Sequence, residues 1–275
     1  MMEMKRYENA AGVVDVSMLE QDKLTFALVI QVLEAPCRKI LTDHARVLLC
    51  YTTPPYPVWA WLPDDAGEDE MEQVRQCILA EFPPEEGFCF NTKYALAEYL
   101  IRREAEEGRE WVIHTNMLAY DCPGLTPPAR PVDGALVLPK PEEQEQVAAL
   151  LKGSYWDTER IVRTEEELLE NARQCIEDKS LYLWKNREGI PVALCGWKGS
   201  GRVGPVYTVP AFRRQGYAAR MVYEVTEKLM EMGLTPHLYT DADYTASNRC
   251  YQMLGYVQRG SLCKVGLREE KPAEA

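Results

Sequence analysis

The pattern of apolar and polar positions divides the first part of the chain into short strands and helices. Strands are predicted at 46–51, 58–62, 88–90 and 111–118, where β-branched and aromatic residues gather between turn residues. Apolar residues at helical spacing predict one helix at about 69–80 and another that begins after Asn91 or Thr92, either of which can cap it. Residues 23–33 fit a helix or a strand, because a short apolar run has no diagnostic period.

The pattern is sharper in the second part of the chain. Strands are predicted at 135–138, 181–185, 191–197, 203–209, 236–240 and 256–265. One helix begins at Pro141, and Thr164 and Glu167 form a capping box that opens the next. A longer helix at about 216–232 ends at Gly233, and a short one follows at 246–254. The inward face of the longer helix is predicted to carry Ala218, Met221, Val222, Val225, Leu229 and Met232.

A stretch rich in proline and glycine separates these two parts. It runs from Cys122 to Gly134 and has the composition of a connection between domains. We therefore expect an N-terminal α/β domain at 1–122, a linker at 123–134, a second domain at 135–268 and a disordered tail at 269–275.

Composition and charge narrow the class of protein. The chain has 275 residues, a hydrophobic content of 46% and a net charge of −12. An acidic surface repels phosphate backbones and anionic lipids, so we expect neither nucleic acid nor membrane as a partner. No apolar run reaches the roughly 18 residues that a membrane span requires. The N-terminus has no signal-peptide pattern, and the protein is expected to be cytoplasmic.

The nine cysteines are expected to be reduced thiols. Their number is odd, the chain is large, and no pair has C-x-x-C spacing. The three histidines, His44, His114 and His237, are too scattered to complete a recognisable zinc set with them. No metal is therefore predicted.

Two glycine patterns in the chain have the glycine spacing of nucleotide-binding motifs but lack the other features that those motifs require. Residues 199–204 fit G-x-G-x-x-G, but a strand follows them where the dinucleotide motif needs a helix. Gly196 and Gly201 have P-loop spacing, yet Arg202 and Val203 stand where Lys and Ser or Thr are required. We interpret the stretch as a hairpin turn.

A more informative loop lies between the strand at 203–209 and the long helix. It carries Arg213 and Arg214 before Gly216, and Ala218 follows in the first helical turn. Backbone N–H groups at a helix start bind phosphate, glycine permits close approach, and arginine adds positive charge. The loop alone is also compatible with an ordinary helix start.

Two motifs give this loop a more specific interpretation. Arg213–Ala218 (R-x-x-G-x-A) resembles the pyrophosphate-binding motif of the GCN5-related N-acetyltransferase (GNAT) superfamily. Asn248–Tyr256 resembles that family's second motif, N-x-x-Y-x-x-x-G-F/Y. The resemblance covers roughly the last 140 residues of the chain and looks closest to the FR47-like branch, which includes the glycine N-acyltransferases. It implies a mixed α/β fold with a splayed central sheet flanked by helices, preceded by a degenerate GNAT-like half.

The resemblance also implies the site and its ligand. Acetyl-CoA or a related acyl-CoA would be the cosubstrate, and no metal would be needed. Tyr251 would be the general acid that protonates the departing thiolate, and the Val209 N–H would polarise the thioester carbonyl. The residues that would bind the cosubstrate are Tyr207, Thr208, Val209, Arg213, Arg214, Gln215, Gly216, Tyr217, Ala218, Ala219 and Asn248.

One family feature is missing. Many members carry a glutamate on the fourth strand, and 203–209 contains no carboxylate. Asp241, Asp243 or a water molecule could serve as the general base, although both aspartates also fit a solvent-facing loop. Cys250 has no recognisable His–carboxylate pair nearby, so it is interpreted as a packed thiol.

Three functions stay open from the sequence. The first is an N-acyltransferase that acts on the amine of a small molecule or amino acid. The second is a non-catalytic acyl-CoA-binding protein, and the third is a protein acetyltransferase. The N-terminal half could supply one wall of the acceptor pocket, and a monomer or a homodimer is expected.

Overall fold

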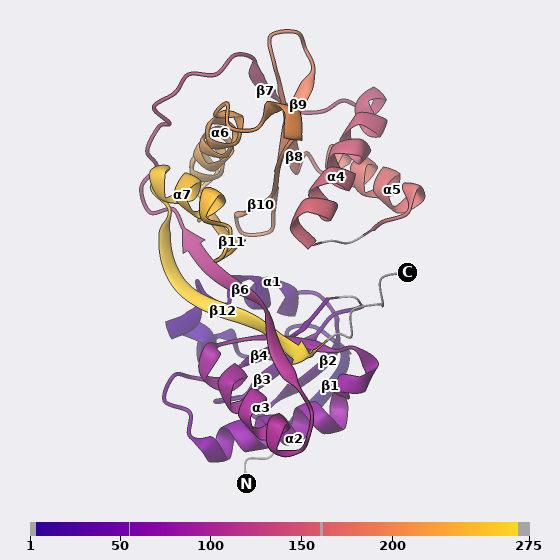
Figure 1. Ribbon diagram of the computed structural model, residues 1–275, viewed down its shortest axis with the longest axis vertical. Coiled ribbons are helices and arrows are strands. Elements are labelled where there is room, and N and C mark those ends of the chain that lie inside the picture. Colours follow the sequence, from indigo (N-terminus) through magenta and orange to yellow (C-terminus); the bar gives the residue numbers. More distant parts are fainter. Residues whose placement is uncertain (1–3, 55, 160–161, 269–275) are drawn as a thin grey trace. The chain divides into compact units, whose positions relative to one another are not determined.

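The computed structural model describes residues 4–54, 56–159 and 162–268 and forms two compact units (Figure 1). Unit 1 comprises residues 1–119, 239–244 and 258–275, and unit 2 comprises residues 120–238 and 245–257. This division differs from the one expected from the sequence, because the proline-rich stretch belongs to unit 2 and the last strand belongs mainly to unit 1. The expected tail at 269–275 lies outside the described residues.

Unit 1 is built around a sheet with the strand order β1-β2-β3-β4-β5-β12-β6. Strands β4 and β5 are parallel, whereas β1–β2, β2–β3, β3–β4 and β5–β12 are antiparallel. Its strands are β1 (Lys5–Ala10), β2 (Cys37–Thr42), β3 (Leu48–Tyr51), β4 (Val58–Trp61), β5 (Cys89–Thr92), β6 (Trp111–Asp121) and β12 (Val257–Leu267). Its helices are α1 (Ala27–Leu33), α2 (Glu68–Glu81) and α3 (Tyr94–Glu106), with 3-10 turns η1 (Val16–Asp22) and η2 (Pro84–Glu86).

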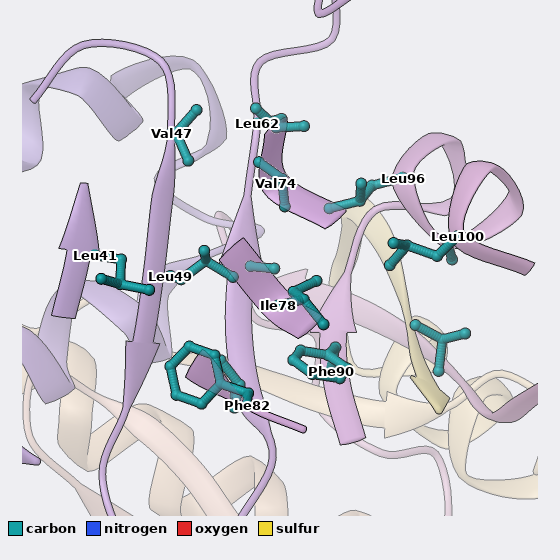
Figure 2. Packing of buried hydrophobic residues seen from close by; sticks show 14 of the residues in the cluster. Leu41, Val47, Leu49, Leu62, Val74, Ile78, Phe82, Phe90, Leu96 and Leu100 are labelled. Atoms are coloured by element: carbon teal, nitrogen blue, oxygen red, sulfur yellow. The ribbon is translucent and has the colours of Figure 1, made fainter. Parts of the chain in front are cut away.

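Both faces of the unit 1 sheet are covered, which explains why β3 and β4 are apolar at every position. Because successive side chains of a strand point to opposite faces, Leu49 packs with α2 and α3, and Leu48 packs with α1. Figure 2 shows the first of these clusters, in which Ile78 of α2 lies beside the strand residue Phe90 and Leu100 of α3 belongs to the same core. This double burial fixes the register of the central strands.

Unit 2 repeats the same plan, with the strand order β6-β11-β10-β9-β8-β7. Its further strands are β7 (Ala135–Val137), β8 (Leu181–Lys185), β9 (Pro191–Lys198), β10 (Arg202–Thr208) and β11 (His237–Asp241). Its helices are α4 (Gln144–Glu159), α5 (Glu165–Glu177), α6 (Tyr217–Glu231) and α7 (Thr245–Met253), with 3-10 turns η3 (Pro141–Glu143) and η4 (Pro210–Phe212). Helices α4 and α5 cover one face of this sheet, and α6 and α7 lie on the other (Figure 1). The predicted mixed α/β fold is confirmed.

Most of the predicted elements of unit 2 are found with small shifts of their ends. The capping box at Thr164 forms, since its Oγ1 accepts the Glu167 N–H at 3.2 Å and its own N–H donates to Glu167 at 2.9 Å. Residues 199–201 form the hairpin turn between β9 and β10. Met232 is the exception on α6: it is 55% exposed rather than inward, because the helix ends at Glu231.

Two features of unit 1 were not predicted correctly. Strands β1 and β2 carry no clear apolar alternation; β1 (KRYENA) is mostly exposed and is held by its pairing with β2. Asn91 and Thr92 were wrong as helix caps, since both lie within β5 and α3 begins after Lys93. Lys93 is the N-cap residue of α3, but its ammonium group can only donate, and it pairs with Asp22 and Asp64.

Candidate functional site

Strands β10 and β11 of unit 2 are parallel but meet only where they begin. Arg202 and His237 are the register pair between them, and the His237 N–H donates to the Gly201 carbonyl at 3.1 Å. Beyond this point β10 continues along β9 as far as Thr208. Within the described residues, the backbone groups on the open side of β10 beyond Arg202 therefore have no strand partner, so they can bind a ligand.

The register of β10 against β9 shows which backbone groups face that opening. One extra residue is inserted between Val203 and Val206, and beyond this bulge Thr208 lies opposite Ala193. The Val209 N–H donates to the Val192 carbonyl at 2.9 Å. Because hydrogen bonding alternates along an antiparallel pair, the N–H groups of Val206 and Thr208 point away from β9.

This geometry corrects the expected oxyanion donor. The Val209 N–H already donates a hydrogen bond to β9 within the sheet, so it is not directed at a thioester carbonyl. The sequence could not show this, because the bulge shifts the alternation by one residue. Thr208 has the required orientation, and its Oγ1 is buried with no hydrogen-bond partner among the described residues. A polar ligand atom would satisfy it.

The side chain of Tyr207 lies on the face of β10 opposite to that of Thr208, and it packs against α4. A Cβ added to Gly153 would lie 2.4 Å from the Tyr207 Oη, so the ring rests directly on the glycine of that helix. Burial raises the pKa of the Tyr207 phenol. Its side chain is thus a support for the strand, while its backbone remains part of β10.

The loop after β10 has the backbone form of an anion-binding turn. Arg214 (φ 62°) and Gly216 (φ 100°) are in the left-handed region, and Gly216 is the N-cap of α6 without a side-chain cap. The first helical hydrogen bond joins the Arg220 N–H to the Gly216 carbonyl at 3.1 Å. The N–H groups of the first turn, Tyr217, Ala218 and Ala219, therefore have no intrahelical acceptor.

The two arginines of this loop differ in their surroundings. Arg213 is committed to the protein: its Nε donates to the Thr208 carbonyl at 3.0 Å, its guanidinium pairs with Asp157 of α4, and it lies 5.8 Å from the Tyr207 ring centroid. Arg214 is exposed and makes no hydrogen bond or ion pair with the described residues. Asp157 was not predicted as a partner, since it lies 56 residues from Arg213 along the chain. Gln215 is exposed, and its amide reaches the Ala211 carbonyl at 3.4 Å.

Helix α7 supplies the residues of the second motif. Asn248 is 7% exposed, and Tyr251 packs edge-on against Tyr256 with 5.7 Å between ring centroids. The Tyr256 hydroxyl lies 2.6 Å from Thr226 Oγ1 of α6, which ties the end of α7 to α6. Both motifs thus lie in unit 2. Burial raises the pKa of Cys250 to about 11, which agrees with a packed thiol and not with a nucleophile.

The two aspartates considered as general bases lie in unit 1. Asp241 accepts the Asp243 N–H at 2.8 Å, and Asp243 accepts the Asn116 amide at 3.1 Å. Both therefore stabilise the loop between β11 and α7. Among the described residues, no group of three or more His, Cys, Asp or Glu side chains could hold a metal ion. None of the cysteines in the described residues forms a disulfide bond.

The start of α2 in unit 1 corresponds to the start of α6 in unit 2, but it is acidic where the loop before α6 is basic. Strands β4 and β5 are parallel there, and α2 begins with Glu68, Asp69 and Glu70. Carboxylates at a helix start repel phosphate. Unit 1 thus has a parallel strand pair like that of unit 2, but the acidic start of its helix α2 is unsuited to a phosphate group.

Comparison with solved structures identifies this architecture. A GCN5-related N-acetyltransferase from Sphaerobacter thermophilus is 14% identical, with a TM-score of 0.69 over 96% of this chain and 95% of that one. A GNAT-family acetyltransferase from Colwellia psychrerythraea is 13% identical, with a TM-score of 0.56 over 97% and 100% of the two chains. A tandem GNAT protein from the clavulanic acid biosynthesis pathway is 11% identical, with a TM-score of 0.54 over 99% and 100%.

These likenesses show that the chain has the fold of the GNAT structures. Residues 186–265 match the family model described as FR47-like protein. No curated protein matches the sequence. Within the described part of the chain, no helix is both long and apolar enough to cross a membrane.

Proposed function

We propose that this protein is an acyl-CoA-dependent N-acyltransferase that transfers an acyl group, most simply acetyl, to the amine of a small molecule or amino acid. The observation that carries the proposal is the path of β10, which leaves β11 after one register pair and runs into a glycine-capped helix. An extended backbone with free donors beside a helix start suits an amide-containing arm joined to a pyrophosphate.

Each part of the site has a role in this proposal. The open side of β10, including Thr208, holds the pantetheine arm, with Asn248 as a further hydrogen-bond partner. The N–H groups of Tyr217, Ala218 and Ala219, together with Arg214, hold the pyrophosphate. Arg213 stabilises the end of β10 through its contacts with Thr208 and Asp157.

Bound acyl-CoA supplies the acyl group as a thioester, whose transfer to a neutral amine requires charge stabilisation and proton movement. The Thr208 N–H is the donor that the register directs away from β9, so it takes the role first expected of Val209. Tyr251 Oη gives a proton to the leaving sulfur. Because β10 has no carboxylate, a water molecule accepts the proton of the amine, and this proton is returned through solvent to the Tyr251 phenolate, so the overall reaction needs no further acid or base.

Binding and catalysis can be tested separately. Titration calorimetry with acetyl-CoA should show one saturable site in the wild-type protein and none in Gly216→Glu, which adds bulk and negative charge at the loop. Gly233→Glu is the matched control: Gly233 (φ 75°) follows the other end of α6 and has open space around it. Binding that survives Gly216→Glu, or that is lost equally in both variants, would overturn the proposed site.

A non-catalytic acyl-CoA-binding protein is the second candidate, and the missing carboxylate on β10 favours it. Release of free thiol in an amine screen separates the two functions. Transferase activity that falls in Tyr251→Phe while acetyl-CoA still binds would support catalysis. Full acetyl-CoA binding without turnover for any amine would support the second candidate.

A further inference from the structure

The proline-rich stretch before β7 is part of unit 2, not a free tether. Near its start, the Thr126 N–H donates to the Leu254 carbonyl at 2.9 Å, at the end of α7. Gly255 packs so closely there that an added Cβ would lie 1.9 Å from the Gly124 carbonyl oxygen. The stretch is therefore fixed against the helix that carries the second motif.

Its other end is fixed at Asp133. One carboxylate oxygen accepts the Tyr217 hydroxyl, the other accepts the Arg187 N–H at 3.0 Å, and the Asp133 carbonyl accepts the Trp184 indole at 2.8 Å. Hydrogen bonding to Tyr217 is the largest of the contacts that lower the pKa of Asp133, so its carboxylate is ionised at neutral pH. Tyr217 is the first residue of α6, so this contact joins the stretch to the start of that helix.

Between these two points the stretch passes beside the glycine of the loop. A Cβ added to Gly216 would lie 3.1 Å from Val132 Cγ1 and 4.0 Å from Arg130 Cβ. Arg130 is exposed and makes no hydrogen bond or ion pair with any described residue. In a chain with a net charge of −12, an arginine held without an acidic partner beside a helix start is placed to meet an anion.

We propose that Arg130 binds a phosphate group of acyl-CoA and that Asp133, through Tyr217, is the positioning residue that holds Arg130 beside the loop. This inference rests on the proposed function. It adds a residue that binds the cosubstrate and lies outside both sequence motifs, and it gives the proline-rich stretch a role in binding. Since proline limits backbone freedom, the segment Pro127-Pro-Ala-Arg-Pro131 presents the arginine at a small entropic penalty.

Calorimetric titration with CoA tests the arginine. Arg130→Gln should weaken binding by about 5- to 30-fold, as expected for the loss of a charge-assisted hydrogen bond. Arg173→Gln is the control, because it removes the same charge from an exposed face of α5 in the same unit, and it should bind within about twofold of wild type. Repeating the titration with 3′-dephospho-CoA assigns the contact. An equal loss indicates the pyrophosphate, and a smaller loss indicates the 3′-phosphate.

The positioning role has its own readout. In a Tyr217→Phe background, which removes the hydroxyl that Asp133 accepts, Arg130→Gln should cause little further loss of CoA affinity. Independent, additive effects would overturn the positioning role. If wild type binds CoA and Arg130→Gln binds equally well, this inference fails and the proposed function stands. If wild type does not bind CoA, the proposed function fails and this inference fails with it.

Discussion

The contact between Gly153 and Tyr207 allows a quantitative test of how β10 is supported. Gly153 lies inside α4, where replacing glycine by alanine ordinarily stabilises a helix by about 1 kcal/mol. Here the added methyl would meet the Tyr207 Oη at 2.4 Å and Cζ at 2.6 Å. Overpacking of this kind costs about 1–3 kcal/mol.

The overpacking penalty should exceed the gain in helix propensity, because the Tyr207 ring has little room to move. It is bounded by Gly153 on α4 and by the guanidinium of Arg213. We therefore expect Gly153→Ala to lower the free energy of unfolding by up to about 2 kcal/mol, the difference between the overpacking and helix-propensity values.

Chemical denaturation of four proteins would check this: wild type, Gly153→Ala, Tyr207→Leu and the double variant. With leucine at 207 the clash disappears, so Gly153→Ala should become stabilising by about 1 kcal/mol in that background. The change of sign is the critical result. If Gly153→Ala stabilises both backgrounds equally, the tyrosine does not rest on this helix and the account of β10 given above is wrong.

Three further predictions concern single side chains of unit 2. Tyr256→Phe should destabilise the protein by about 1–3 kcal/mol in urea unfolding, because it leaves buried Thr226 Oγ1 without its hydrogen-bond partner at 2.6 Å. Adding Thr226→Val, which removes the unsatisfied hydroxyl, should recover part of the lost stability. Burial lowers the pKa of His237 from its ordinary value of 6.5. Near and below pH 6.5 the unfolded state therefore binds a proton more readily than the folded state does. The free energy of unfolding should fall as the pH drops below 6.5. A His237→Gln variant should lose less stability on acidification; an identical pH profile would exclude this histidine as the cause. Cys250, with its pKa raised to about 11, should react with iodoacetamide far more slowly in the folded protein than in urea, as mass spectrometry of the modified peptide can show. Rapid native-state labelling at Cys250 would contradict the packed-thiol interpretation.

The sequence determined the elements and the motifs of unit 2. Apolar spacing located α6 and its neighbouring strands, since an amphipathic helix and a buried strand each impose a local period. The motif around Gly216 was equally local, because a left-handed N-cap needs a residue without a Cβ. Strands β1 and β2 were missed because pairing, not apolar alternation, holds the exposed β1 in place.

The tertiary structure alone decided which groups of those motifs are available. A bulge in β10 assigned the Val209 N–H to the sheet and left that of Thr208 facing the opening. Asp157 engaged Arg213, and Asp133 brought Arg130 beside Gly216. These contacts join residues far apart along the chain, so no local pattern records them. They arise only when the helices and the proline-rich stretch pack around the sheet of unit 2.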